Sequence, residues 1–262
     1  MPCVISSPST DCGKTTLSLL ISCWAYSKGL NLQTFKVGPD YLDQQQLSSI
    51  GQPICRNLDI FLSGENWVQN VFYKYSRKYE YSLIEGAMRL FDGLGPTVYS
   101  STANVAKLLD IPVIFIVNAR GQVASLLPLI RGFQDFDKGI SIKGIIFNNV
   151  NSDRHKKLIK EVFVNENIEI LGFLPSDQNI ALKKANLGLI SPLDNDQNID
   201  VNYFARFAEE NIDFNSLKKF LNPPQNKFID ISDKKDFKMN KKKPIAIVED
   251  KIFHFQYPET KE

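Results

Sequence analysis

The sequence predicts an α/β fold in which helices cover both faces of a doubly wound, mostly parallel sheet. Six short apolar runs recur along the chain, at Cys3–Ile5, Leu32–Val37, Ser82–Ile84, Ile111–Val117, Ile142–Phe147 and Ile168–Phe173. Strands that are buried on both faces of a parallel sheet are continuous apolar runs of this kind. Most of the stretches between these runs have helical spacing, which gives the alternation that a doubly wound sheet requires.

Two of the predicted helices have a clear apolar face. Apolar residues recur at i, i+3, i+4 and i+7 in both, at Leu17, Leu20, Ile21 and Trp24 and again at Val123, Leu126, Leu127 and Ile130. Because this spacing places the side chains on one side of a helix, we interpret both faces as core packing. Gly29 follows the first helix where a glycine cap is expected.

The composition of the chain changes near residue 215, which predicts a domain boundary. We expect one domain over residues 1–214, then a linker over 215–243 that is rich in lysine, asparagine and aspartate. An apolar run resumes after the linker, and we interpret 244–262 as the truncated start of a second domain.

Charge and cysteine usage exclude several classes of function. Lysine and arginine exceed aspartate and glutamate by 31 to 29, so the net charge gives no reason to expect a nucleic-acid or membrane partner. The four cysteines have no CxxC spacing and both histidines lie far from them, which argues against zinc and disulfides. The longest apolar run, Ile111–Val117, is too short to span a membrane. We therefore expect a soluble, cytoplasmic protein.

The strongest motif is Ser-Thr-Asp-Cys-Gly-Lys-Thr-Thr, which runs from Ser9 to Thr16 between the first predicted strand and helix. Backbone N–H groups at a helix start form a nest for phosphates, a lysine reaches the β and γ oxygens, and the next hydroxyl holds Mg²⁺. Pro8 replaces the usual first glycine, so the match depends on Gly-Lys-Thr-Thr and its position. We expect ATP and Mg²⁺ here, with the nucleotide bound by Thr10, Asp11, Cys12, Gly13, Lys14, Thr15 and Thr16.

Asp11 is an unusual residue in this loop, because a carboxylate repels phosphates unless it points away or contacts metal or base. The sequence leaves these alternatives open. Serines, a proline and a threonine occupy Ser7 to Thr10, where partition and septum-positioning ATPases have a signature lysine. This absence argues against a nucleotide-switched ATPase of that kind.

Two further segments bring charged residues to the ends of predicted strands. The first, Lys-Val-Gly-Pro-Asp-Tyr-Leu-Asp, contains Lys36, Asp40 and Asp43, and the second, Glu-Gly-Ala-Met-Arg-Leu-Phe-Asp-Gly, contains Glu85 and Asp92. Ligands bind at the carboxyl edge of open α/β sheets, so we expect these side chains to face the phosphate loop. Carboxylates for a hard cation and a lysine for the transferred group are typical of phosphoryl transfer. The alternative is that the acids are solvated turn residues.

These segments, together with Gly-Ile-Ile-Phe-Asn-Asn-Val-Asn-Ser-Asp-Arg-His (144–155) and Ile-Leu-Gly-Phe-Leu-Pro-Ser-Asp (170–177), resemble the cobyrinic and hydrogenobyrinic acid a,c-diamide synthases. That family is related to dethiobiotin synthetase and cobyric acid synthase. The likeness covers almost the whole chain in order, and residues 245–259 resemble the opening of the family's glutaminase domain. The resemblance implies a P-loop NTPase fold of the dethiobiotin synthetase kind.

The resemblance also implies a reaction, which is amidation of the a and c carboxylates of a corrinoid in cobalamin biosynthesis, with ATP and with ammonia from glutamine. Phosphorylation turns a carboxylate oxygen into a leaving group that ammonia can displace. By analogy with the family, Lys14 and Lys36 neutralise the phosphates, Thr15, Glu85 and Asp40 hold Mg²⁺, Asp43 and Asp92 place the substrate, and Asn148 reads the adenine. An asparagine at this position is equally suited to capping the next helix.

Three departures from the family pattern bear on this expectation. Arg89 replaces a glycine, where a cation either narrows the crevice or pairs with substrate carboxylates, and Asn186 replaces a histidine. The glutaminase cysteine and histidine have no counterpart, so ammonia would be free or supplied by a glutaminase in trans. The sequence leaves open whether the protein forms a homodimer. It also leaves three alternative functions open: another dethiobiotin synthetase-like ligase, a nucleotide-switched positioning ATPase, and an inactive fragment.

Overall fold

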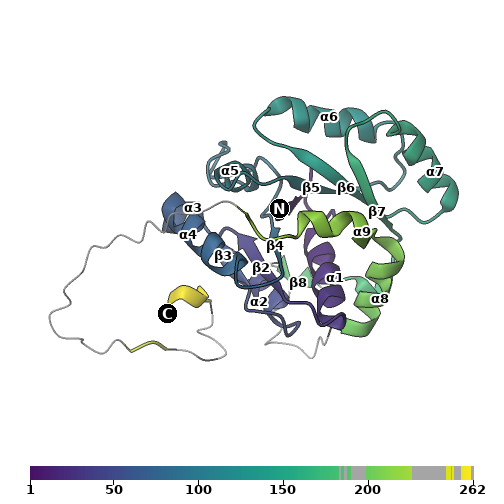
Figure 1. Cartoon of the computed structure of the whole chain (residues 1–262). Helices are drawn as coiled ribbons and strands as arrows, with labels where there is room; N and C mark the ends of the chain where they lie inside the picture. Colours follow the sequence, from purple (N-terminus) through teal and green to yellow (C-terminus); the bar gives the residue numbers. More distant parts are fainter. Residues whose placement is uncertain are drawn as a thin grey trace.

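A seven-stranded parallel sheet forms the centre of the protein, as the apolar runs predict (Figure 1). The computed structural model describes residues 1–182, 184–185, 188–189, 199–225, 246–248, 250 and 255–260. The strand order is β3-β2-β4-β1-β5-β6-β7. These strands are β1 (Cys3–Ser6), β2 (Leu32–Val37), β3 (Arg56–Leu58), β4 (Tyr81–Glu85), β5 (Val113–Asn118), β6 (Ile142–Asn148) and β7 (Glu169–Leu174). A separate antiparallel pair joins β8 (Lys184–Ala185) and β9 (Gly188–Leu189).

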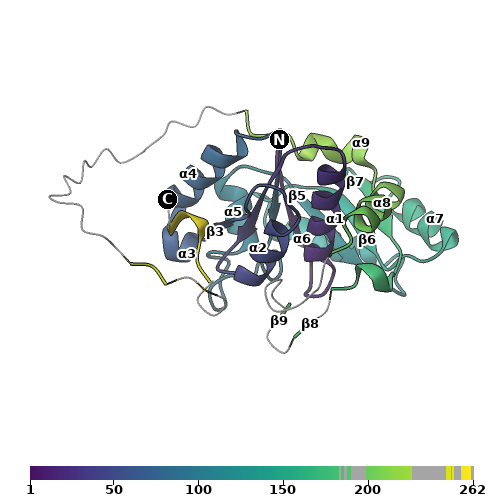
Figure 2. The same cartoon turned by 90° about the horizontal axis from the view of Figure 1, so that it is seen from below.

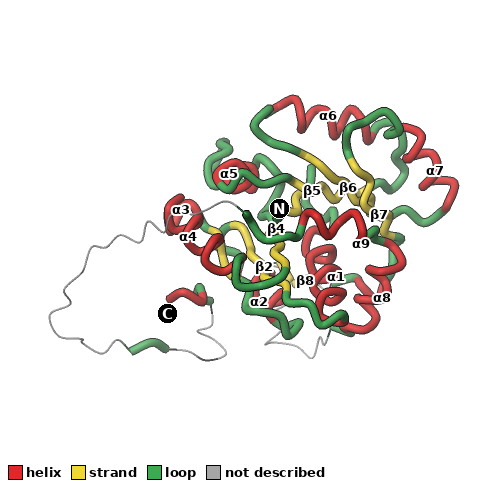
Figure 3. Tube along the Cα trace, viewed as in Figure 1, coloured by secondary structure: helices red, strands yellow, loops and turns green. Residues whose placement is uncertain are grey.

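Helices cover both faces of the sheet, which confirms the predicted doubly wound class (Figures 2 and 3). One face carries α1 (Lys14–Ser27), α2 (Tyr41–Ser48), α8 (Val201–Asn211) and α9 (Phe214–Leu217). The other carries α3 (Ile60–Ser63), α4 (Glu65–Ser76), α5 (Thr102–Leu108), α6 (Leu126–Phe136) and α7 (Asp153–Val162). Short 3₁₀ turns are η1 (Gln178–Ile180), η2 (Lys218–Phe220) and η3 (Pro258–Thr260).

The strand β5 shows how one apolar run fills both layers of the core. Phe115 and Val117 belong to the hydrophobic cluster under α3 to α7, whereas Ile114 and Ile116 belong to the cluster under α1 and α8. Successive side chains of a strand point to opposite faces, so a strand covered on both faces has to be apolar at every position. Because all seven strands are parallel, their carboxyl ends lie at the same edge of the sheet.

The end of α1 confirms the predicted role of Gly29. Its φ of 65° lies in the left-handed region that glycine adopts without steric cost. The Gly29 amide donates to the Tyr26 carbonyl at 3.0 Å, and the Leu30 amide donates to the Ala25 carbonyl at 2.9 Å. This pair of bonds is the Schellman motif, which satisfies carbonyls that the helix leaves without partners.

Two elements differ from those that the apolar periodicity predicts. The helix α6 begins at Leu126, not at Val123. Pro128 has no N–H and fits only in the first turn of a helix, so the proline fixes the start. The edge strand β3 escapes prediction because it is short and two of its three residues, Arg56 and Asn57, are polar.

The described structure continues past residue 214, where the sequence predicts a boundary. Leu217 in α9 and Leu221 after it are buried against the α1 face of the sheet. Most of the predicted linker and about half of the predicted second-domain start lie outside the described residues, and so does Asn186. Among the described helices, none combines the length and apolarity that crossing a lipid bilayer requires.

Candidate functional site

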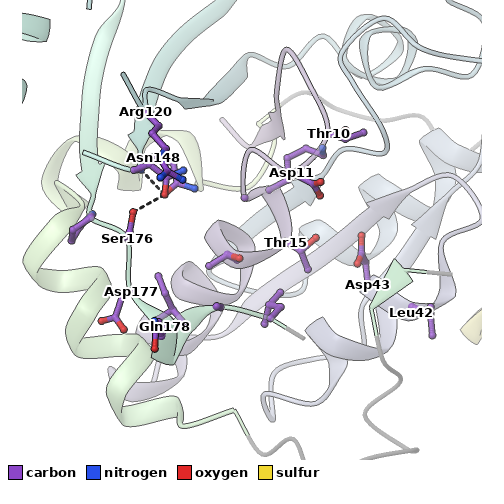
Figure 4. Close-up of a pocket in the computed structure, with 18 of the residues that line it drawn as sticks. Thr10, Asp11, Thr15, Leu42, Asp43, Arg120, Asn148, Ser176, Asp177 and Gln178 are labelled. Carbon is purple, nitrogen blue, oxygen red and sulfur yellow. Dashed lines mark hydrogen bonds between the residues drawn. The ribbon is translucent and has the colours of Figure 1, made fainter. Parts of the chain in front are cut away.

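The phosphate-loop motif lies in the turn between β1 and α1, where the sequence predicts it (Figure 4). Gly13 precedes the helix with a φ of 102°, and Asp11 has a φ of 60°. Lys14 is the first helical residue, so the amides of the first turn of α1 point into the loop without helical partners. Such a group of N–H donors favours a bound anion.

Asn148, the last residue of β6, holds this loop in place. Its side-chain amide donates to the Cys12 carbonyl at 2.8 Å, and its oxygen accepts the Asn149 amide at 2.8 Å. A Cβ atom added at Gly13 would lie 2.8 Å from the Asn148 Nδ2 atom. The close approach of Asn148 therefore requires glycine at position 13.

Lys14 reaches back across the loop. Its ammonium donates to the Ser7 hydroxyl at 3.1 Å, a neutral partner that an anion can replace. Burial, followed by the charge of Lys36, lowers the pKa of Lys14 from its ordinary value. An anion bound at this loop would offset both effects, because it would supply the missing countercharge.

Behind the loop, Lys36 and Glu85 form a buried ionic centre. The Lys36 ammonium donates to Glu85 Oε1 at 2.9 Å and to the Gly86 carbonyl at 3.3 Å, and it pairs with Asp43. Asp40 lies 3.6 Å from the same ammonium. The Thr15 hydroxyl donates to Glu85 Oε1 at 2.7 Å. These contacts join the phosphate loop to the ends of β2 and β4, as predicted.

The pKa values in this centre follow from burial and from Lys36. Burial raises the pKa of Glu85 to about 7, and the Lys36 charge opposes the shift. Burial also raises the pKa of Asp40. For Asp43, burial alone would raise the pKa, but the charge of Lys36 and its hydrogen bond outweigh burial and lower it. Burial opposes the charged form of Lys36, yet the three carboxylates together raise its pKa.

A cavity of about 910 Å³ opens over the phosphate loop at the carboxyl edge of the sheet. Thr15 and Asp43 lie on one side of it, and Asn148 and Ser176 lie on the other (Figure 4). The predicted residues that line it are Thr10, Asp11, Gly13, Lys14, Thr15, Thr16, Lys36, Asp40, Asp43 and Asn148. The loops after β1, β2, β4, β5, β6 and β7 thus meet in one cavity.

The structure places three predicted residues elsewhere. Glu85 is fully buried below the cavity and accepts hydrogen bonds from Thr15 and Lys36, and Cys12 is buried within the loop. Asp92 is not among the residues that line the cavity. It pairs with Arg89 at 2.8 Å, and both side chains are partly exposed.

Residues without a predicted role also line the cavity, including Met88, Arg120, Asn149 and Ser176. Asn149 donates to Asn118 Oδ1 at 2.9 Å and accepts from the Ser176 hydroxyl at 2.8 Å, which links the ends of β5, β6 and β7. Each of these residues comes soon after a predicted strand. That position is the signal that points to them, because the loops at the carboxyl ends of parallel strands gather at one edge of the sheet.

The Thr15–Glu85 pair fits a hard divalent cation. The buried Glu85 Oε2 atom has no hydrogen-bond partner among the described residues. A hydroxyl, a carboxylate and the oxygens of phosphate and water are the ligands that Mg²⁺ prefers. Asp40 is connected to this pair through Lys36. In the described part of the chain, no group of three histidine, cysteine or acidic side chains is arranged to hold a metal by itself.

The chain is similar in sequence to known proteins. The chain is 38% identical over 264 residues to a cobyrinate a,c-diamide synthase of Caldanaerobacter subterraneus, which covers 99% of this chain and 57% of that protein. Synthases of the same name from Synechocystis and Methanococcus maripaludis are 36% and 33% identical, with 98% and 97% of this chain covered and 54% and 58% of theirs.

The chain therefore spans little more than half the length of these relatives, and the similarity confirms the resemblance that the motifs indicate. The model of a family described as "CobQ/CobB/MinD/ParA nucleotide binding domain" matches residues 3–189, which include the phosphate loop and every strand end described above. The chain belongs to this family of nucleotide-binding domains.

Proposed function

We propose that this chain binds MgATP and uses it to convert the a and c carboxylates of a corrinoid into amides through acyl phosphates. The observation that carries the proposal is the position of the phosphate loop beside Lys36, Asp40 and Asp43 in one cavity. The printed name of the relatives, cobyrinate a,c-diamide synthase, supports the corrinoid substrate. The reaction is that of a carbon–nitrogen ligase.

The chemistry accounts for the charges around the cavity. A carboxylate oxygen attacks the γ-phosphorus of ATP, a new P–O bond forms, and the bond to ADP breaks. Ammonia then attacks the acyl carbon and forms a C–N bond. The C–O bond to the phosphate breaks, phosphate leaves with the electron pair, and the nitrogen loses a proton. Negative charge moves from the γ-phosphate to ADP, so fixed cations and N–H donors near both groups lower the barrier.

The predicted residues that lie in or directly beneath the cavity have roles in this scheme. Lys14 and the loop amides would hold the phosphates. Lys36 would neutralise the charge of the transferred phosphoryl group and orient Asp43. Thr15 and Glu85, with Asp40 beside them, would hold Mg²⁺, which neutralises phosphate charge when bound. We assign substrate placement to Asp43, because Asp92 pairs with Arg89 outside the cavity. Asn148 would set the loop and contact the base.

The source of ammonia belongs to the same proposal. We assign ATP-dependent amidation to the domain predicted over residues 1–214, together with the packed residues up to Leu221. The linker would then run to 243, and 244–262 would be the start of a glutamine amidotransferase domain. Ammonia would then come from glutamine through such a domain, or from free ammonium. The four cysteines are free, which is in keeping with a cytoplasmic enzyme.

Corrinoid-dependent phosphate release tests the proposal. The chain is incubated with MgATP, ammonium and cobyrinic or hydrogenobyrinic acid, and phosphate and amide products are measured. We expect release to require the corrinoid and to equal amide formation. Phosphate release that does not depend on the corrinoid but increases with DNA or lipid would contradict the proposal and favour a positioning ATPase.

A further inference from the structure

A short segment near the end of the described chain packs against the β3 edge of the sheet (Figure 2). We call Phe255–Thr260 the docked segment. Tyr257 and Asp59 are in direct contact although they lie 198 residues apart. The side chains that receive the segment are those of Tyr41, Arg56 and Asp59, which we call the seat.

An ion pair fixes one end of the docked segment. The Arg56 Nη1 atom lies 2.6 Å from Glu259 Oε1, and the two side chains are only 10% and 8% exposed. The guanidinium also lies 3.3 Å from the centroid of the Tyr75 ring. Because the pair is largely removed from water, salt and side-chain motion weaken it less than they weaken a surface pair.

Aromatic stacking and a hydrogen bond fix the other end. The Tyr257 hydroxyl donates to Asp59 Oδ2 at 2.7 Å. The Tyr41 ring stacks on both Phe255 and Tyr257, with centroids 5.3 Å apart in each case and interplanar angles of 4° and 27°. The seat therefore combines charge, hydrogen bonding and stacking, and each part comes from a different residue.

The seat is connected directly to the acidic side of the cavity. Tyr41 is the first residue of α2, and Asp40 before it caps this helix by accepting the Asp43 amide at 3.1 Å. Within β3, Asn57 follows Arg56 and donates to the carbonyls of Gly38 at 2.9 Å and of Asp40 at 3.3 Å. The residues that contact the docked segment, Tyr41 and Arg56, are therefore each adjacent in sequence to a residue of the Asp40 turn or to one that holds it.

We propose that the docked segment positions Asp40 and Asp43, with Tyr257 and Glu259 as positioning residues that act through Tyr41 and β3. The helix α2 has 8 residues, a length at which isolated helices do not hold their shape in water. Its place depends on contacts with the rest of the protein, and the docked segment supplies some of these contacts through the Tyr41 ring. Asp40 and Asp43 then face Lys36 from a fixed backbone.

Hydrogen exchange of the α2 amides tests this positioning without any assumption about function. Tyr257→Phe and Glu259→Gln are made separately in the full chain, and exchange over residues 41–48 is followed by mass spectrometry. We expect each change to speed exchange there about fivefold, the factor that corresponds to losing one ordinary hydrogen bond. Glu166→Gln, which breaks the more exposed Arg131–Glu166 pair between α6 and the loop after α7, is the control and leaves α2 unchanged. Unchanged α2 exchange in both seat variants would overturn the inference.

The affinity for MgATP gives a second readout, which depends on the proposed function. We expect the dissociation constant to rise severalfold in Tyr257→Phe and Glu259→Gln and to stay constant in Glu166→Gln. Faster α2 exchange with unchanged MgATP affinity would limit the positioning to the helix and overturn its extension to the cavity. If the unmodified chain bound no MgATP, the proposed function would fail, and the exchange result alone would still decide whether the segment positions α2.

Discussion

Gly13 shows how the backbone of a single residue sets the phosphate loop. Its φ of 102° is a conformation that L residues with side chains rarely adopt, and Asn148 leaves no room for a Cβ atom. The sequence marks Gly13 as part of the motif, but the second restriction comes from a residue 135 positions later. Only the parallel pairing of β5 with β1 and β6 brings Asn148 over the loop.

Replacing Gly13 by alanine is expected to weaken MgATP binding at least about tenfold, or ~1.4 kcal/mol, because both backbone and Asn148 must shift. Isothermal titration calorimetry measures the effect. Gly29→Ala is the matched control, since Gly29 also has a positive φ but a Cβ there would meet nothing within 4 Å. We expect that control to lose about 1 kcal/mol of stability and to bind MgATP normally. Normal binding by Gly13→Ala would argue against this loop as the phosphate site.

The Lys14→Ala change removes the cation nearest the loop amides. We expect turnover to fall at least about 100-fold, the range found when one electrostatic donor is removed from an active site. The fold should persist, because the Lys14 ammonium donates to the neutral Ser7 hydroxyl and its removal leaves no buried carboxylate without its cation. Thermal unfolding and phosphate release are measured together, with exposed Lys143→Ala as the control. Full activity after Lys14→Ala would refute the proposed phosphate cradle.

At the scale of elements, local sequence decides where helices begin and end. The Schellman motif at Gly29 and the first-turn proline of α6 can both be understood from neighbouring residues. The strand β3 cannot, because Arg56 and Asn57 carry no strand signal and are held by β2 on one side and by the docked segment on the other. An edge strand takes its structure from the elements that it contacts.

The helix α7 offers a direct measure of such a local signal. Ser152 caps it by accepting the His155 amide at 3.2 Å. Ser152→Ala leaves that amide without its partner, so we expect the free energy of unfolding to fall by about 1 kcal/mol. Chemical denaturation of both proteins provides the comparison, and Ser152→Asp, which restores a capping oxygen, should recover most of the loss. Equal stability of the alanine variant would mean that water satisfies the amide equally well.

At the scale of the whole molecule, the two-layered core makes the central strands hard to alter. Phe115 is fully buried in β5, between β1 and β6. Phe115→Ala is expected to lower the free energy of unfolding by about 3–5 kcal/mol, through lost burial and the cavity left behind. Phe136→Ala is the control, since 69% of that side chain is exposed and its loss should cost less than about 1 kcal/mol. A similar effect at both positions would contradict the assigned core.

The α/β class, the positions of six strands and the phosphate-loop motif can be predicted from the amino-acid sequence, because they depend on local periodicity and on adjacent residues. The same is true of Lys36, Asp40 and Asp43 at a strand end. By contrast, three contacts are visible only in the folded chain: Glu85 lies beneath Thr15, Asp92 pairs with Arg89 away from the cavity, and Tyr257 contacts Asp59. These contacts join distant parts of the chain, and their geometry is set by how the sheet packs, which no local pattern encodes.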